Sequence, residues 1–169
     1  MLRPIVRYGN PALVTKAANV TAFDATIHTL INDMIDTMYA APGIGLAAPQ
    51  VGVPLRVAVI DLSIGKRGGD VITLVNPEYV AQEDVQVEEE GCLSVPGFNA
   101  TVARPSRVVV RALDRAGRET TVEGTGLLAR ALQHELDHLD GVLFLDRLRG
   151  IKRDLIVRRV RKLQKLGRW

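Results

Sequence analysis

The segment His134-Glu135-Leu136-Asp137-His138 constrains this 169-residue chain more than any other feature. It lies in a stretch where apolar residues recur at helical spacing, between Gly124 and the stop signal Asp140-Gly141. Helix positions four apart share one face, so both imidazoles can ligate the same ion, with Glu135 beside it. The alternative is an ordinary polar helix face. The motif predicts that the chain folds around a metal-binding helix.

A metal site needs a third ligand, and its identity separates the classes of enzyme that share this motif. The long form H-E-x-x-H-x-x-G-x-x-H is excluded because Phe144 stands where the third histidine would be. A thermolysin-like site is excluded because no glutamate follows Glu135. Asp146 and Asp154 remain candidate carboxylate ligands, although Asp146 is expected to lie where the last helix begins and suits the positive end of that helix.

Upstream, Cys92 is the only cysteine, which excludes an intrachain disulfide. It lies in the segment Glu90-Gly91-Cys92-Leu93-Ser94, at the end of an expected strand. Its thiolate would complete a site of two histidines and one cysteine and leave a fourth position for water, as in catalytic metal sites. A lone cysteine is otherwise a small buried hydrophobe. The histidine pair favours the ligand interpretation.

A glycine-rich segment, Gly43-Ile44-Gly45-Leu46-Ala47-Ala48-Pro49-Gln50, superficially fits the dinucleotide fingerprint G-x-G-x-x-A. That fingerprint needs a strand before it and a helix after it, whereas here a helix precedes it and Pro49 and a strand follow. The segment suits close approach of a peptide backbone instead, with the Gln50 carboxamide offering two N–H donors.

The length predicts one domain, and the periodicity predicts an α+β fold. An amphipathic helix is expected over 23–38, with Thr21 and Asp24 as its capping signal and Pro42 after its end. Apolar spacing predicts a last helix near the C-terminus, with Leu148, Ile151, Leu155, Val160 and Leu163 on its apolar side. Between residues 50 and 123, short β-rich runs follow one another without helices, which favours antiparallel sheets packed around the central H-E-x-x-H helix. The expected strands are 55–60, 71–75, 85–89, 107–113 and 119–122.

Charged residues are distributed unequally along the chain. The net charge of +3 combines a strongly basic tail with an acidic remainder, because residues 147–169 hold ten of the 22 Lys and Arg residues and a single acid, Asp154. Such a basic helix indicates an acidic partner, nucleic acid being the commonest, or simply a solvated helix face.

No apolar run approaches the roughly 18 residues that a membrane span needs. The first residues, MLRPIVRYGNP, lack the apolar core of a signal peptide. The sequence therefore predicts a soluble protein that is not secreted and has no membrane partner. The expected location is the cytoplasm, with an organelle as the alternative only if a transit peptide is missing from this chain.

The segments GIGLAAPQ, EGCLS and QHELDH, in this order, resemble the three signature motifs of bacterial-type peptide deformylase, and YGNPAL and the C-terminal helix extend the resemblance to the whole chain. The resemblance implies a metal-dependent hydrolase that removes the N-formyl group from the formyl-methionine of nascent polypeptides and releases formate. It also implies a catalytic domain over 1–146 and a basic C-terminal helix over 147–169, packed on the same domain, that docks on the ribosome.

The resemblance further implies a role for each motif residue. Cys92, His134 and His138 would hold one divalent ion, ferrous iron in the cell, with zinc, nickel or cobalt able to replace it. Glu135 would take a proton from water and return it to the leaving amine. The tetrahedral oxygen would be stabilised by Gln50 and the backbone N–H of Leu93, while Gly45 would bond the substrate backbone.

The methionine pocket is expected to include Ile44, Leu127 and Ala131, where Arg130 departs from family members that are apolar at that position. We expect Glu90 to pair with Arg104 and steady the cysteine loop. Two other interpretations stay open: a metallopeptidase acting on internal bonds, and a ribosome- or RNA-binding protein whose metal is structural.

Overall fold

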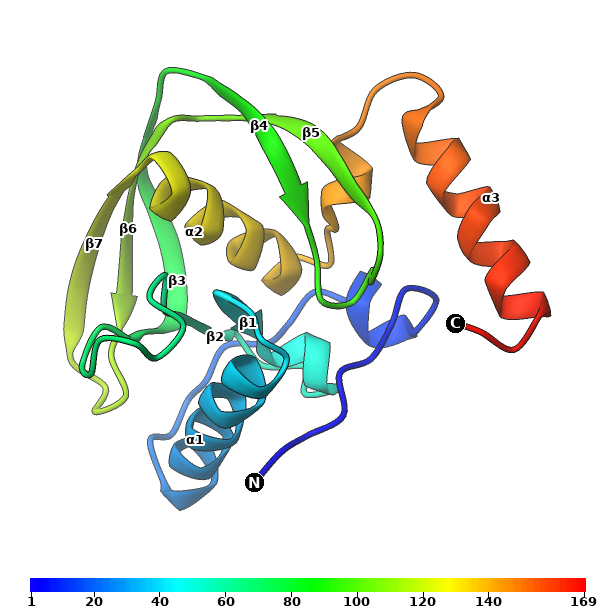
Figure 1. The fold of residues 1–169 in the computed structure, drawn as a ribbon. Helices are drawn as coiled ribbons and strands as arrows, with labels where there is room; N and C mark the ends of the chain where they lie inside the picture. The colour runs from blue at the N-terminus through cyan, green and yellow to red at the C-terminus, as the bar shows by residue number, and fades with distance from the viewer.

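Helix α2 (Gly126–Leu139) lies between a five-stranded sheet and a two-stranded sheet (Figure 1). Ten of its 14 residues are buried, including Leu132, Leu136 and His138. The apolar ones pack with residues of the larger sheet such as Leu74 and Val110. The α+β prediction, with antiparallel sheets around the helix that carries the histidines, is confirmed by this computed structural model, which describes residues 1–169.

Both sheets are antiparallel throughout. The larger has the order β1-β2-β3-β6-β7, and the smaller is the hairpin β4-β5. The bounds are β1 (Gly45–Ala47), β2 (Val57–Ile60), β3 (Ile72–Glu83), β4 (Gln86–Gly91), β5 (Asn99–Arg104), β6 (Arg107–Leu113) and β7 (Glu119–Thr125).

The strand predictions missed β1 and β5 and ended β3 too early. Strand β1 has only three residues and lies inside the glycine-rich segment, where no alternation can be read. Strand β3 continues past Pro77, a residue that normally ends a central strand. The register shifts between Val75 and Glu78, and this irregularity accommodates a proline that cannot donate to the ladder.

Helix α1 (Ala25–Ala40) covers β1 and β2 at the lower part of the molecule (Figure 1). Its N-cap is Asp24, whose carboxylate accepts hydrogen bonds from the N–H groups of Thr26 and Ile27. The expected cap at Thr21 is therefore wrong. That prediction placed Asp24 inside the helix, whereas the carboxylate of Asp24 is itself the capping group.

Helix α3 (Lys152–Lys165) lies at the edge of the molecule (Figure 1). None of the helices combines the length and the apolar character that a membrane span requires. Val157 and Val160 are its buried residues, whereas Leu155 is 54% exposed and Ile151, just before the helix, is 71% exposed, so the predicted apolar side was placed partly wrong. Asp146 does not begin this helix. It lies in the short 3-10 helix η3 (Phe144–Arg147) and accepts a hydrogen bond from Leu143 N.

The loop after β2 is organised by the buried carboxylate of Asp61. The Tyr39 hydroxyl donates to Asp61 Oδ2 at 2.5 Å, and Ser63 donates to Oδ1 from both its N–H (2.8 Å) and its hydroxyl (2.7 Å). The Gly65 N–H is a further donor to Oδ2, at 3.0 Å. The hydrogen bond from Tyr39, with those from the loop, lowers the pKa of Asp61 to about 2 against the effect of burial.

We expect Asp61→Asn to destabilise the fold in a pH-dependent way. The folded pKa lies below the unfolded value of about 3.9, so the carboxylate stabilises the fold fully above that value. This stabilisation is lost as the pH falls from about 4 through about 2. Urea unfolding at a series of pH values should show the free-energy gap between wild type and variant closing over this range. A gap that stays constant down to pH 2.5 would contradict the prediction.

Candidate metal centre

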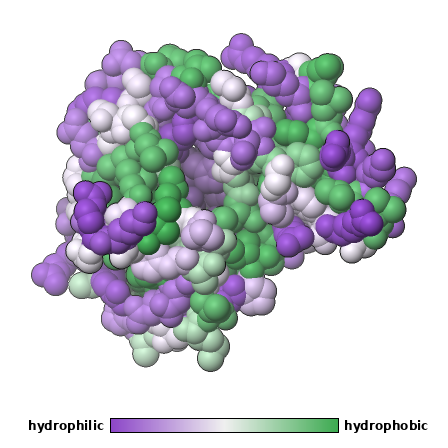
Figure 2. Space-filling view, viewed as in Figure 1, coloured by the Kyte–Doolittle hydropathy of each residue, from purple (hydrophilic) through white to green (hydrophobic).

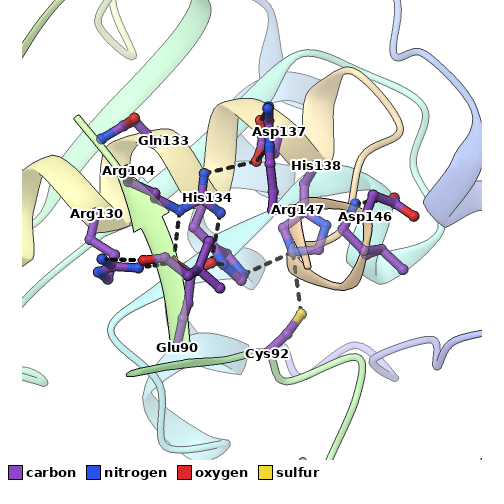
Figure 3. Close-up of polar contacts among 12 residues, drawn as sticks. Glu90, Cys92, Arg104, Arg130, Gln133, His134, Asp137, His138, Asp146 and Arg147 are labelled. Carbon is purple, nitrogen blue, oxygen red and sulfur yellow. Dashed lines mark hydrogen bonds and ion pairs between the residues drawn. The ribbon is translucent and has the colours of Figure 1, made fainter. Parts of the chain in front are cut away.

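Cys92, His134 and His138 form a compact group of possible metal ligands (Figure 3). Their ligand atoms lie within 4.8 Å of one another. His138 Nε2 lies 3.1 Å from His134 Nε2 and 3.3 Å from Cys92 Sγ. The histidines project from one face of α2, and Cys92 follows directly after β4. The fold therefore brings together two segments that are more than 40 residues apart in the sequence.

Glu90 orients the imidazole of His134 through a hydrogen bond at Nδ1. Its Oε2 lies 2.6 Å from His134 Nδ1, so the imidazole proton belongs on Nδ1 and the Nε2 lone pair faces the group. Burial alone would raise the pKa of Glu90, but hydrogen bonds from Arg104 and His134 hold it well below its usual range. Burial lowers the pKa of His134, but hydrogen bonds with Cys92 and Glu90 outweigh it, and the pKa is raised above its usual range.

The donors fit a divalent metal ion. Burial, followed by the neighbouring charge of His134, lowers the pKa of His138, which favours the neutral imidazole that binds metals. Its Nδ1 is buried without a hydrogen-bond partner. The three possible ligand atoms face one another, and thiolate plus imidazole is a donor set that zinc, iron, nickel and cobalt accept.

Glu135 lies beside this group with one carboxylate oxygen unpaired. The side chain is buried, and Oε2 has no hydrogen-bond partner. Burial raises the pKa of Glu135 to about 7. Gly45 of β1 packs directly against it, because a Cβ at position 45 would lie 2.6 Å from Glu135 Oε1. The glycine is needed for this close approach.

Gln50 is buried, and both the oxygen and the nitrogen of its side-chain amide are hydrogen-bonded. Oε1 accepts a hydrogen bond from Ala47 N at 3.0 Å, so the amide nitrogen points toward the metal-ligand group. This nitrogen donates to Ser94 Oγ at 3.1 Å and lies 3.6 Å from Cys92 Sγ. In the adjacent loop, Ser94 N and Val95 N donate back to Cys92, whereas the Leu93 N–H has no acceptor within the protein.

A cavity of about 890 Å³ opens over these residues. Figure 2 shows the hollow near the centre of this face, with apolar residues along its border. The predicted pocket residues Ile44, Leu127 and Ala131 all line it, Leu127 being at the rim with 54% exposure. The wall also contains Ile64 and Arg130.

A buried charge network behind the histidines extends beyond the predicted pair. Arg104 binds both oxygens of Glu90 at 2.7 Å, and its third nitrogen donates to Asp137 at 2.9 Å. Arg130 and Arg147 complete the network, with ion pairs to Glu90 and Asp137 respectively (Figure 3). Asp137 and Arg147 were not predicted from the sequence. Asp137 lies inside the histidine motif, which is the one available signal, but its partners cannot be read from spacing.

The downstream carboxylates do not join the metal-ligand group. Asp146 accepts from Leu143 N and lies 3.6 Å from Arg153 Nε, and Asp154 lies in the first turn of α3. The ligand group contains Cys92 and the two histidines alone.

Comparison with known proteins agrees with this geometry. A family model described as polypeptide deformylase matches residues 2–154. The chain is 49% identical over 169 residues to the peptide deformylase of Acidobacterium capsulatum, covering 100% of this chain and 99% of that one. A peptide deformylase crystal structure from Legionella pneumophila is similar with a TM-score of 0.92 at 47% identity, covering 99% and 98% of the two chains. The Ehrlichia chaffeensis enzyme in complex with actinonin is similar with a TM-score of 0.88 at 38% identity, covering 95% and 96%. The chain belongs to the polypeptide deformylase family, whose members are metal-dependent hydrolases that remove the N-formyl group from nascent chains.

Proposed function

We propose that this protein hydrolyses the N-formyl group of N-formylmethionyl peptides and releases formate in the cytoplasm, where nascent chains are made. One observation carries the proposal: Cys92, His134 and His138 converge at a cavity that also contains the unpaired carboxylate of Glu135. The metal ligands, a general base and a cavity for the substrate therefore lie together in one site.

Cys92 Sγ, His134 Nε2 and His138 Nε2 would hold one divalent ion, and ferrous iron is the ion that we propose for the cell. When bound, the ion lowers the pKa of a water molecule toward neutrality and polarises the formyl carbonyl.

An iron site with a thiolate ligand is prone to oxidation at Cys92, so activity should decay in air and persist under nitrogen. Equal half-lives under the two gases would argue against iron.

Glu135 is assigned as the proton carrier. A carboxylate takes the proton of the attacking water and returns it to the amine as the C–N bond breaks. The unpaired Oε2 is the free acceptor that this role requires, and no neighbouring donor has to be displaced first.

Gln50 and Leu93 are assigned to the developing oxyanion. As the formyl carbon becomes tetrahedral, its oxygen gains negative charge, which preorganised N–H donors stabilise. The Gln50 amide is held in place by Ala47 N and Ser94 Oγ, and the Leu93 N–H is unoccupied.

The peptide would lie along the edge of β1. This strand pairs only with β2, which leaves the other edge, including Gly45, free to bond a peptide backbone. Ile44, Leu127 and Ala131 line the cavity and would contact the methionine side chain.

We expect Gly45→Ala to lower kcat/KM by about 100-fold or more. The added Cβ would collide with Glu135 Oε1 and displace the carboxylate, and misplacement by about 1 Å can cost that much. Formate release and metal content should be measured together, with Gly68→Ala as the matched control because a Cβ there meets nothing within 4 Å. A Gly45→Ala enzyme with normal kcat/KM would refute the close-approach argument.

The substrate assignment is tested with three peptides: formyl-Met-Ala-Ser, acetyl-Met-Ala-Ser and formyl-Glu-Ala-Ser. We expect turnover of the first, little of the second, and a large loss for the third, whose charge would be buried in an apolar pocket. Equal rates on acetyl and formyl peptides would overturn the deformylase assignment, and equal rates on the two formyl peptides would overturn the methionine pocket.

We also propose that residues 1–146 form the catalytic part and that the helix in 147–169 docks on the ribosome. Six basic residues of this segment are exposed and available for phosphate contacts: Arg158, Arg159, Arg161, Lys162, Lys165 and Arg168. Trp169 and Ile156 pack against the cluster next to Cys92, so deletion of the tail would disturb the body.

The docking proposal is therefore tested with a charge variant, in which Arg158, Arg159 and Lys162 become glutamine. Cosedimentation with ribosomes should fall in the variant and, for the intact protein, on raising the salt concentration. Equal cosedimentation of variant and intact protein would show the proposal to be wrong.

A further inference from the structure

Arg130 is a buried charge in the wall of the cavity. Its side chain is 5% exposed, and it lies on α2 one turn before His134, between the pocket residues Leu127 and Ala131. A buried guanidinium is costly unless its donors are paired. Its partners therefore indicate why a charge is retained at this position.

All three partners of Arg130 lie on the hairpin β4-β5. Nη1 donates to Glu90 Oε1 at 2.8 Å, and Nη2 donates to the backbone oxygen of Val102 at 2.8 Å. Nε donates to Gln86 Oε1 at 3.3 Å. One side chain of α2 thus reaches both strands of the hairpin, and the planar fork of arginine can make these three contacts at once.

Through Glu90, Arg130 also reaches the first histidine ligand. Oε1 of Glu90 accepts from Arg104 and Arg130, while Oε2 accepts from Arg104 and His134. Both oxygens are fully occupied, so the carboxylate has one orientation, with Oε2 directed at His134 (Figure 3). Without Arg130, Oε1 keeps one donor and the hairpin loses its side-chain bonds to this turn of α2.

The hairpin carries Cys92 and the helix carries both histidines, so the contact between them sets the distance between thiol and imidazoles. We propose that Arg130 is a positioning residue for the metal site: it fixes the hairpin that carries Cys92 on α2 and holds Glu90 against His134. The proposal rests on the assignment of Cys92, His134 and His138 as metal ligands.

The experiment compares the Co²⁺ dissociation constant of wild type, Arg130→Met and Arg130→Lys, by competition with a chelator under nitrogen. Methionine keeps an unbranched apolar side chain in the pocket, and lysine keeps the charge without the fork. We expect Co²⁺ affinity to fall about 10- to 100-fold in Arg130→Met, the usual cost of losing a supporting contact. A smaller fall is expected in Arg130→Lys. Arg107→Met, which removes ion pairs to Glu83 and Glu123 on the surface, is the matched control and should bind like wild type.

A second comparison separates positioning from lining of the pocket. In Glu90→Gln protein, adding Arg130→Met should cost much less Co²⁺ affinity than it does in wild type, because part of its effect acts through Glu90. Unchanged Co²⁺ affinity in Arg130→Met would overturn the proposal, and a raised KM in that variant would then assign Arg130 to lining of the pocket alone. If Arg130→Met does not fold, wild-type affinity in Arg130→Lys would overturn it equally. Failure of wild type to bind Co²⁺ would instead refute the ligand assignment in the proposed function.

Discussion

Glu135→Gln protein is expected to lose about 10²- to 10⁴-fold in kcat while keeping the metal content of wild type. Glutamine fills the same volume but cannot accept and return a proton. The two measurements are formate release at saturating substrate and metal content by elemental analysis of the same samples.

The same substitution is expected to leave the protein as stable as wild type, or more stable. Glu135 is buried and Oε2 has no partner, so the carboxylate is held at a cost to the fold. Thermal unfolding of metal-free samples checks this. A variant with kcat within threefold of wild type would remove Glu135 from the mechanism, and a much less stable variant would give it a structural role instead.

Cys92→Ala is expected to abolish metal retention and, with it, activity. The thiol is one of three ligands, so its loss should weaken metal affinity by well over the roughly 10- to 100-fold that a supporting residue costs. Equilibrium dialysis against Zn²⁺ or Co²⁺ measures this directly. Ser94→Ala is the matched control for metal content, since it changes the same loop without removing a ligand.

Normal metal content in Cys92→Ala would show that the third ligand lies elsewhere. Asp146 and Asp154 were the carboxylate candidates, but Asp146 is engaged by Leu143 N and Arg153. A variant that retains metal would therefore need a ligand outside the present group.

The periodic parts of the fold could be predicted from the sequence alone. Helix α2 and strand β6 have strong patterns of a single period, and β6 spans the predicted residues 107–113. Strand β5 was missed because it follows Pro96-Gly97, which indicates a loop. Its alternating burial arises from tertiary packing, since Val102 lies in a cluster with Phe144 and Leu145 of η3. The exposed Leu155 shows the same limit: periodicity gives a helix, but the neighbours decide which side is covered.

The metal ligands could be predicted because they occur in short motifs, and the pairing of Glu90 with Arg104 was expected as well. The other charges that support the ligands, on Asp137, Arg130 and Arg147, could not be predicted. Arg104 lies 33 residues from Asp137, and Arg130 lies 40 residues from Glu90. No local pattern links such residues, since their contacts arise only when the hairpin folds over α2. In the sequence, Arg130 was a departure at an apolar position, and its partners became visible only in the structure.

The most direct test is to give metal-loaded protein a formylated peptide of about ten residues and follow every product by mass spectrometry. A deformylase removes one formyl group per peptide, leaving a free N-terminal methionine and an intact chain. Stoichiometric formate with no internal cleavage is the predicted result. Cleavage of an internal peptide bond, or no formate from a fully metallated sample, would contradict the account.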